Sequence, residues 1–118
     1  MTLTLTGNTA VSDFYGNIRT LPISTKSTTY TLVAGDKGKL ISTSANVAVP
    51  PNVFSPGEVV CIYNNSASNI TITQGSSVRM NLVGTTFTGN RTLAQRGFST
   101  VQCTTDGFTF IVTGGGLT

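Results

Sequence analysis

Residues 59–74, VVCIYNNSASNITITQ, decide how this sequence is interpreted. Two runs rich in β-branched and aromatic residues flank a short Asn/Ser/Ala segment, and neither run carries a charge. Runs of this kind, bounded by turn residues, are typical of two β-strands joined as a hairpin. In the second strand, alternation points Ile70 and Ile72 to the core and the threonines outward. In VVCIY both faces are apolar, which predicts a central strand covered on both sides.

The same strand period continues in both directions from this hairpin. Apolar and polar residues alternate in TLTLT at 2–6 and in the segments at 28–34, 39–44, 97–104 and 107–114, and turn residues such as Gly, Pro and Asn lie between these segments. The Asp-Gly pair at 106–107 predicts a second hairpin, GDKGK at 35–39 a charged hairpin turn, and no window sustains a helical period. We therefore predict an all-β fold, an antiparallel β-sandwich or small, jelly-roll-like β-barrel at residues 28–118, preceded by an N-terminal arm at 1–27.

The arm differs from the rest of the chain. Its apolar residues come in short bursts broken by glycines, and its predicted contact residues are Leu3, Leu5, Phe14 and Tyr15. Such a segment either caps its own domain or packs on a neighbouring subunit, and composition leaves both alternatives open.

Charge and hydropathy exclude several classes of function. Seven basic and four acidic residues give a net charge of +3, and the basic residues are scattered rather than grouped, which argues against a nucleic-acid binder. No apolar run approaches the ~20 residues of a membrane-spanning helix, and no signal peptide is evident at the N-terminus. We expect a protein made in the cytoplasm, with no membrane insertion.

Candidate catalytic residues are sparse. The chain has no histidine, which removes the usual general base and the commonest metal ligand. The four acids, Asp13, Asp36, Glu58 and Asp106, each lie near turn signals, where such side chains usually bind their own backbone. Only a pair brought together by folding would serve glycoside hydrolysis. We predict no enzyme activity, no cofactor and no metal site.

The two cysteines, Cys61 and Cys103, lie within apolar strand patterns. Buried thiols that act as small hydrophobic groups are favoured for a chain kept in a reducing compartment. Neighbouring strands would also permit a disulfide, so the alternative stays open at this point.

Three segments carry a resemblance to a known family: PPNVFSPGEVVCIYNNS at 50–66, TITQG at 71–75 and TGNRTLAQRGFSTV at 88–101. With the residues around them, over 28–118, they resemble a β-rich module of virion-surface and tail-fibre proteins of tailed bacteriophages, of the marine-phage and cyanophage type. The resemblance implies a structural protein at the virion surface, without catalytic residues, and homotrimers are usual among such projections.

A tail fibre needs a shaft and an anchor, whereas here the module follows only about 27 residues. We therefore expect a capsid decoration, or cement, protein that binds the major capsid protein or other virion proteins and stabilises the head, with Leu3, Leu5, Phe14 and Tyr15 of the N-terminal arm as its capsid anchor. The alternative is a tail-fibre or baseplate tip that recognises a host surface glycan.

Overall fold

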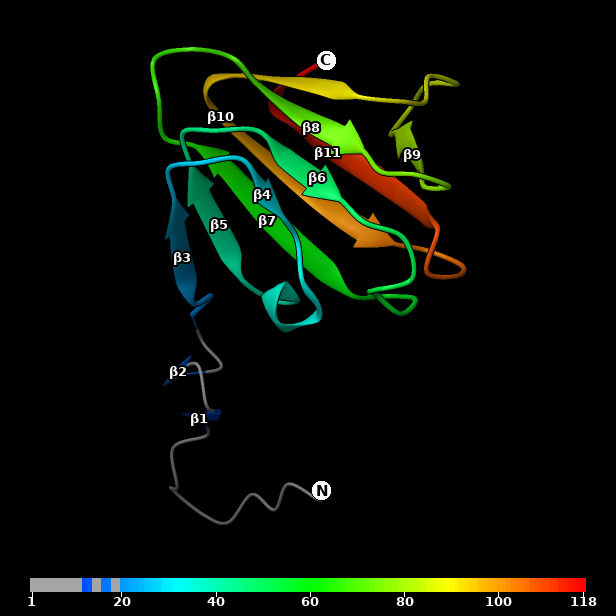
Figure 1. The fold of residues 1–118 in the computed structure, drawn as a ribbon, viewed down its shortest axis with the longest axis horizontal. Helices are drawn as coiled ribbons and strands as arrows, with labels where there is room; N and C mark the ends of the chain where they lie inside the picture. The colour runs from blue at the N-terminus through cyan, green and yellow to red at the C-terminus, as the bar shows by residue number, and fades with distance from the viewer. Residues whose placement is uncertain (1–11, 14–15, 18–19) are drawn as a thin grey trace.

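The computed structural model describes residues 12–13, 16–17 and 20–118, and in the first two of these ranges the backbone alone. Leu3, Leu5, Phe14 and Tyr15 lie outside the described residues. Eleven strands and one 3₁₀ turn make up the described fold (Figure 1): β1 Ser12–Asp13, β2 Gly16–Asn17, β3 Ile23–Lys26, β4 Tyr30–Thr31, η1 Ala34–Asp36, β5 Leu40–Thr43, β6 Val47–Val49, β7 Val59–Asn64, β8 Ile70–Gln74, β9 Arg79–Leu82, β10 Arg91–Cys103 and β11 Thr109–Leu117.

From β3 to β8, successive strands alternate between two layers of the fold. Strands β3, β5 and β7 pair in parallel in the back layer of Figure 1, and β4, β6 and β8 pair in parallel in the front layer. Parallel neighbours need a long crossover between them. Here each crossover contains a strand of the opposite layer, so that β4 lies between β3 and β5 in the sequence.

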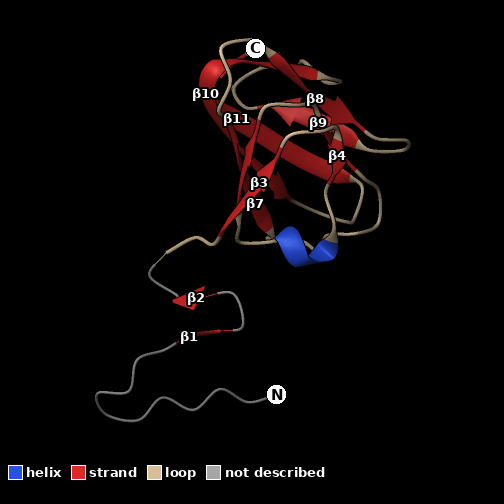
Figure 2. Cartoon of the chain, turned by 60° about the vertical axis from the view of Figure 1, so that its left-hand side comes forward, coloured by secondary structure: helices blue, strands red, loops and turns tan. Residues whose placement is uncertain are grey.

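Strand β10 closes the two layers into a nearly closed, barrel-shaped sheet. Its first residues pair antiparallel with β8, as Leu93 does with Ile70, and its later residues pair antiparallel with β7, as Phe98 does with Tyr63. The register shifts between these two halves, where Arg96 has a positive φ of 58°. The strand therefore turns a corner and belongs to both layers (Figure 2).

Strands β11 and β9 complete the back layer. β11 pairs antiparallel with β10 after the turn at Asp106–Gly107, which confirms the predicted C-terminal hairpin, and β9 pairs in parallel with β11. Gly114 faces β10 so closely that a Cβ would overlap the carbonyl of Phe98, whereas a Cβ on Gly115 would meet nothing within 4 Å.

The core fills the space between the layers. Ile70, Ile72 and Phe110 are at most 4% exposed, which confirms the inward faces predicted for these strands. The rings of Phe54 and Phe110 meet edge to face, with centroids 6.1 Å apart. The other buried apolar residues are Leu32, Ile41, Val47, Val49, Val60, Ile62, Val78, Met80, Leu93, Val101, Cys103 and Val112.

One buried polar side chain joins the layers at the corner. Asn64 is fully buried, and its Nδ2 group donates to the carbonyls of Ser68, Leu93 and Ala94 at 2.7, 3.1 and 3.0 Å. Its Oδ1 accepts from the N–H and hydroxyl of Ser66 at 3.0 and 2.7 Å. This side chain therefore satisfies backbone groups of the β7–β8 connection and of the β10 corner together.

The all-β prediction is confirmed, but some of the predicted strand pairings are wrong. Strands β7 and β8 do not form a hairpin, because they lie in different layers and each pairs with β10 instead. Antiparallel pairing holds for β1 with β2 and for the strands that flank β10, whereas the crossovers make the other pairs parallel, unlike a jelly roll. The segment at 35–39 leads from β4 across to β5 through η1, and is no hairpin turn.

The sheet also reaches further toward the N-terminus than the segment at 28–118. β3 at Ile23–Lys26 pairs with β5, and so belongs to the sheet although its residues fall within the stretch that the sequence assigned to the arm.

Candidate functional site: an uncharged sheet face

The side of the back layer that is turned away from the front layer presents one continuous outer face (Figure 1). The strand registers align its side chains in three rows, for example Leu40, Cys61 and Thr100 in one row, and Ser42, Tyr63 and Phe98 in the next. We call this surface the outer face, and it consists of Ile23, Thr25, Leu40, Ser42, Val59, Cys61, Tyr63, Phe98, Thr100, Gln102, Ile111 and Thr113.

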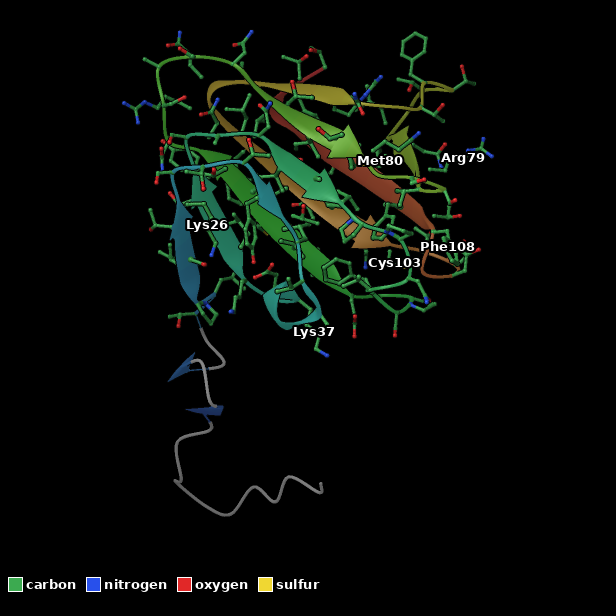
Figure 3. The ribbon with its side chains drawn as sticks, in the orientation of Figure 1. Lys26, Lys37, Arg79, Met80, Cys103 and Phe108 are labelled. Carbon is green, nitrogen blue, oxygen red and sulfur yellow. The ribbon has the colours of Figure 1, made fainter. Side chains whose placement is uncertain are left out.

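None of these twelve side chains is charged, and seven of them are apolar or aromatic; Arg79 of β9, opposite Thr109, lies on the same side of the sheet. Ile23 is 67% exposed and Phe98 43%, while most of the others are partly exposed because their neighbours in the sheet shield them from the side. Arg79 lies at the rim, one row beyond Ile111, and Figure 3 shows its side chain pointing away from the sheet. Contiguous exposed apolar surface of this kind marks interaction sites in soluble proteins.

The front layer presents a different outer surface. Its outward side chains are small, and all but one are threonines: Thr31, Ala48, Thr71, Thr73 and Thr92. Hydroxyl groups of this kind remain hydrated at little cost, so this face needs no partner. The contrast singles out the back layer as the surface suited to burial against another protein.

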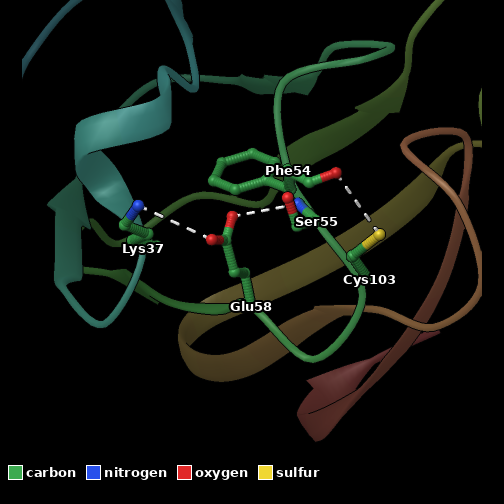
Figure 4. A network of polar contacts seen from close by, with 5 residues as sticks. All are labelled: Lys37, Phe54, Ser55, Glu58 and Cys103. Carbon is green, nitrogen blue, oxygen red and sulfur yellow. Dashed lines mark hydrogen bonds and ion pairs between the residues drawn. The ribbon is translucent and has the colours of Figure 1, made fainter.

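The lower end of the fold in Figure 1 carries a small polar network, which Figure 4 shows from close by. Glu58 accepts a hydrogen bond from the Ser55 N–H at 3.0 Å, and its other carboxylate oxygen lies 3.5 Å from Lys37 Nζ. An exposed ion pair of this type contributes at most about 1 kcal/mol. The network therefore fixes the loop before β7 and offers no catalytic arrangement.

A second polar cluster orders the turn around η1. The Asp36 carboxylate is buried and accepts hydrogen bonds from the Tyr30 hydroxyl at 2.6 Å and the Val33 N–H at 2.9 Å. Burial, and then the bond to Asp36, raise the pKa of Tyr30 to about 12. The Lys26 ammonium lies 4.2 Å from the centre of the Tyr30 ring, a cation–π distance.

The described carboxylates are each engaged in local contacts. Asp36 and Glu58 are used as above, and Asp106 accepts from the Phe108 N–H at 2.9 Å, which confirms the predicted turn role. No group of three or more potential ligands that could hold a metal ion occurs in the described part of the chain. The side chain of Asp13 is not among those described.

Both cysteines are free thiols, as the sequence favoured. Cys61 belongs to the outer face, whereas Cys103 points into the core and donates to the Asp106 carbonyl at 2.7 Å. Because the two side chains project to opposite sides of the sheet, they are not positioned to form a disulfide. Burial raises the pKa of the Cys103 thiol, and the nearby Asp106 and Glu58 carboxylates raise it further.

Sequence reasoning placed the contacts in the arm, and the outer face was missed. The signal was present in VVCIY, whose second face, Val59, Cys61 and Tyr63, is as apolar as its first. That pattern predicted that other parts of the protein would cover both sides of this strand. In the described fold, the front layer covers only its inner side.

Among residues 20–118, no helix is long and apolar enough to span a membrane. Comparison of the chain with protein-family models, with curated proteins and with solved structures finds no match.

Proposed function

We propose that this chain is a structural, non-catalytic protein of a bacteriophage virion surface, and that it decorates the capsid through protein–protein contacts of its outer face. The observation that carries the proposal is the uncharged, largely apolar outer face on a chain with a net charge of +3. Burying this face against another protein removes no charged group from water. The desolvation of charged groups opposes the association of charged surfaces. The resemblance of residues 28–118 to a module of bacteriophage virion-surface proteins is the reason for proposing a phage particle.

A matched pair of variants tests the surface. Thr100→Lys introduces a charge into the middle of the outer face, and Thr73→Lys makes the same change on the threonine-rich face of the front layer. Both threonines are partly exposed strand residues, so that the two variants share their chemistry and differ in the surface they alter. We expect Thr100→Lys to weaken binding to undecorated capsids at least tenfold, about 1.4 kcal/mol, and Thr73→Lys to bind normally. Equal binding by the two variants would refute the proposal for this face.

Cys61 offers a readout that needs no substitution. As a free thiol on the outer face, it should react with a maleimide in the isolated protein and be protected on the particle. Buried Cys103 should react slowly in both samples and so serves as an internal control.

The copy number of the protein in purified virions, measured by quantitative mass spectrometry against the major capsid protein, tests the location. A ratio near that of the capsid protein supports decoration, and absence from the virion refutes the family reading. A ratio of a few per cent favours the tail-fibre or baseplate tip.

For that alternative, Phe87 is the side chain to examine, because it is 63% exposed on the β9–β10 connection and aromatic rings commonly line ligand sites. Binding of the isolated protein to host cells, competed by host polysaccharide, would support the tip.

A further inference from the structure

Strand β3 ends the back layer with an open edge, at the left of the fold in Figure 1. β5 pairs with one side of β3, and among the described residues no strand pairs with the other. The carbonyls of Pro22 and Lys26 accept hydrogen bonds from N–H groups on the β5 side, at 2.9 and 3.3 Å. Backbone groups alternate in direction along a strand, so Leu21, Ile23 and Thr25 direct their N–H and C=O groups to the open side.

This edge lacks the features that usually prevent edge strands from pairing. Such strands are commonly blunted by a proline, a bulge or a charged side chain on the edge. Pro22 has its missing N–H on the side of β5, and β3 follows β5 in an unbroken register. The Lys26 ammonium is held over β4, 4.2 Å from the centre of the Tyr30 ring. The edge therefore presents backbone donors and acceptors to which another strand can bond.

The side chains beside the open edge are largely apolar. Ile23, at 67% exposure, is the most exposed large apolar side chain in residues 20–118, and Leu21 is 50% exposed. Side chains alternate along a strand, so Leu21, Ile23 and Thr25 lie on the same side of β3, which is the side of the outer face. A strand paired with this edge would cover Leu21 and Ile23 as well as bond to the backbone.

The edge is complementary to itself. In an antiparallel pair about a two-fold axis at Ile23, the Ile23 side chain lies opposite Ile23 of the partner subunit, and Leu21 lies opposite Thr25 of the partner subunit. All of these residues direct their N–H and C=O groups to the open side, so every pair can form hydrogen bonds. Lys26 lies three residues from the axis, which leaves the two ammonium groups at opposite ends of the paired strands. A second copy therefore supplies the apolar, uncharged strand that this edge fits.

We propose that two copies of this chain pair antiparallel along β3, about a two-fold axis at Ile23. A contact that uses the same patch on both subunits closes after two copies, in contrast to the homotrimers that the resemblance implies. The two back layers then form one continuous sheet, and their outer faces point the same way, because opposed residues of an antiparallel pair share a face.

The pairing itself does not depend on the virion function. Its consequence for capsid binding rests on the proposed function of the outer face. A dimer carries two such faces side by side, so that binding of one to the particle raises the effective concentration of the other. The dimer would then hold a capsid more tightly than the monomer does.

Sedimentation equilibrium of the full chain tests the association. Ile23→Lys places like charges opposite each other at the axis, which disfavours cross-strand pairing. Val33→Lys is the matched control, because Val33 is a 52% exposed apolar residue outside β3. We expect a reversible monomer–dimer equilibrium whose dissociation constant rises at least tenfold in Ile23→Lys and is unchanged in Val33→Lys. A monomer at millimolar protein concentration, a trimer, or equal effects of the two substitutions would overturn the proposal.

A disulfide across the axis tests the register. Opposed residues of a hydrogen-bonded antiparallel pair have Cα atoms about 5.5 Å apart, within disulfide range. Ile23→Cys and Thr25→Cys are compared in a Cys61→Ser background, so that the outer face carries one thiol. In the proposed register the two copies of Thr25 lie at least about 13 Å apart, four residues out of step. Ile23→Cys should therefore oxidise to a covalent dimer at least tenfold faster than Thr25→Cys, and equal rates would contradict the pairing.

Hydrogen exchange separates a second copy from a segment of the same chain on this edge. We expect protection of the Ile23 and Thr25 N–H groups to increase with protein concentration and to be lost in Ile23→Lys. Protection that is the same at low and high concentration would place a segment of the same chain on the edge and refute the dimer.

Discussion

Replacing Asn64 with alanine tests the junction of the two layers. The substitution removes five hydrogen bonds, leaving three backbone carbonyls and the Ser66 N–H without that partner. The bond to Leu93 is buried, while the other groups lie where water can reach them more readily. An unsatisfied buried group costs about 1–3 kcal/mol, and the small cavity adds roughly 1 kcal/mol. We therefore expect a loss of about 3 kcal/mol in the free energy of unfolding.

Urea denaturation followed by circular dichroism measures this loss. At constant m-value the midpoint should fall, and in a thermal scan the same loss lowers Tm by about 10 °C for a domain of this size. Asn69→Ala, at an exposed position of the same connection, is the matched control and should change stability by less than about 0.5 kcal/mol. A loss below about 1 kcal/mol for Asn64→Ala would refute the assignment of Asn64 as the side chain that joins the layers.

Three further predictions follow from the core, the glycine run and the η1 turn. Phe110→Ala should cost about 3–5 kcal/mol in urea denaturation, whereas Phe108→Ala, at a side chain that is 38% exposed, should cost less than about 1 kcal/mol; similar costs would contradict the deep burial of Phe110 in the core. Gly114→Ala should lower Tm because its Cβ overlaps the Phe98 carbonyl, whereas Gly115→Ala should leave Tm unchanged or slightly raised; equal Tm values would show that the two strands are not in this close contact. Because the pKa of Tyr30 is raised to about 12, the folded state keeps a proton that the unfolded state loses near pH 10, so this contribution to stability is complete below pH 10 and is lost as the pH rises to 12. Tyr30→Phe should remove that part of the alkaline loss in urea titrations at pH 9 to 12, and an unchanged pH dependence would count against the Tyr30–Asp36 bond.

The strand positions were readable from the sequence, but their partners were not. Alternation at Ile70, Ile72 and Phe110 correctly gives the inward faces, because the side-chain period is the same for every kind of strand pair. For that reason it cannot distinguish a parallel neighbour from an antiparallel one. The Asn/Ser segment after Asn64 has the composition of a hairpin turn, yet it crosses between layers, with the Asn64 side chain supplying the bonds that the connection needs.

The candidate site was predictable only in part. The two apolar faces of VVCIY are plain in the sequence, but whether both are covered depends on which strands pair with β7. Likewise, RTLAQRG at 91–97 lacks a strand period because it contains the corner of β10, where Arg96 takes a left-handed conformation. The local sequence pattern does not show which strands that are distant in the sequence pair with each other.

The position of β10 has a consequence for the order in which the protein folds. The six strands β3 to β8 of the two parallel sets all precede it in the chain, as does β9, yet neither layer is joined to the other by strand pairing until β10 is available. On a ribosome, the wound strands would emerge with sheet edges open and with their apolar inner sides exposed. We therefore expect cooperative folding to await release of the C-terminal hairpin. Nascent chains that end before Cys103 should be sensitive to protease and should associate with chaperones, whereas the finished chain should be resistant.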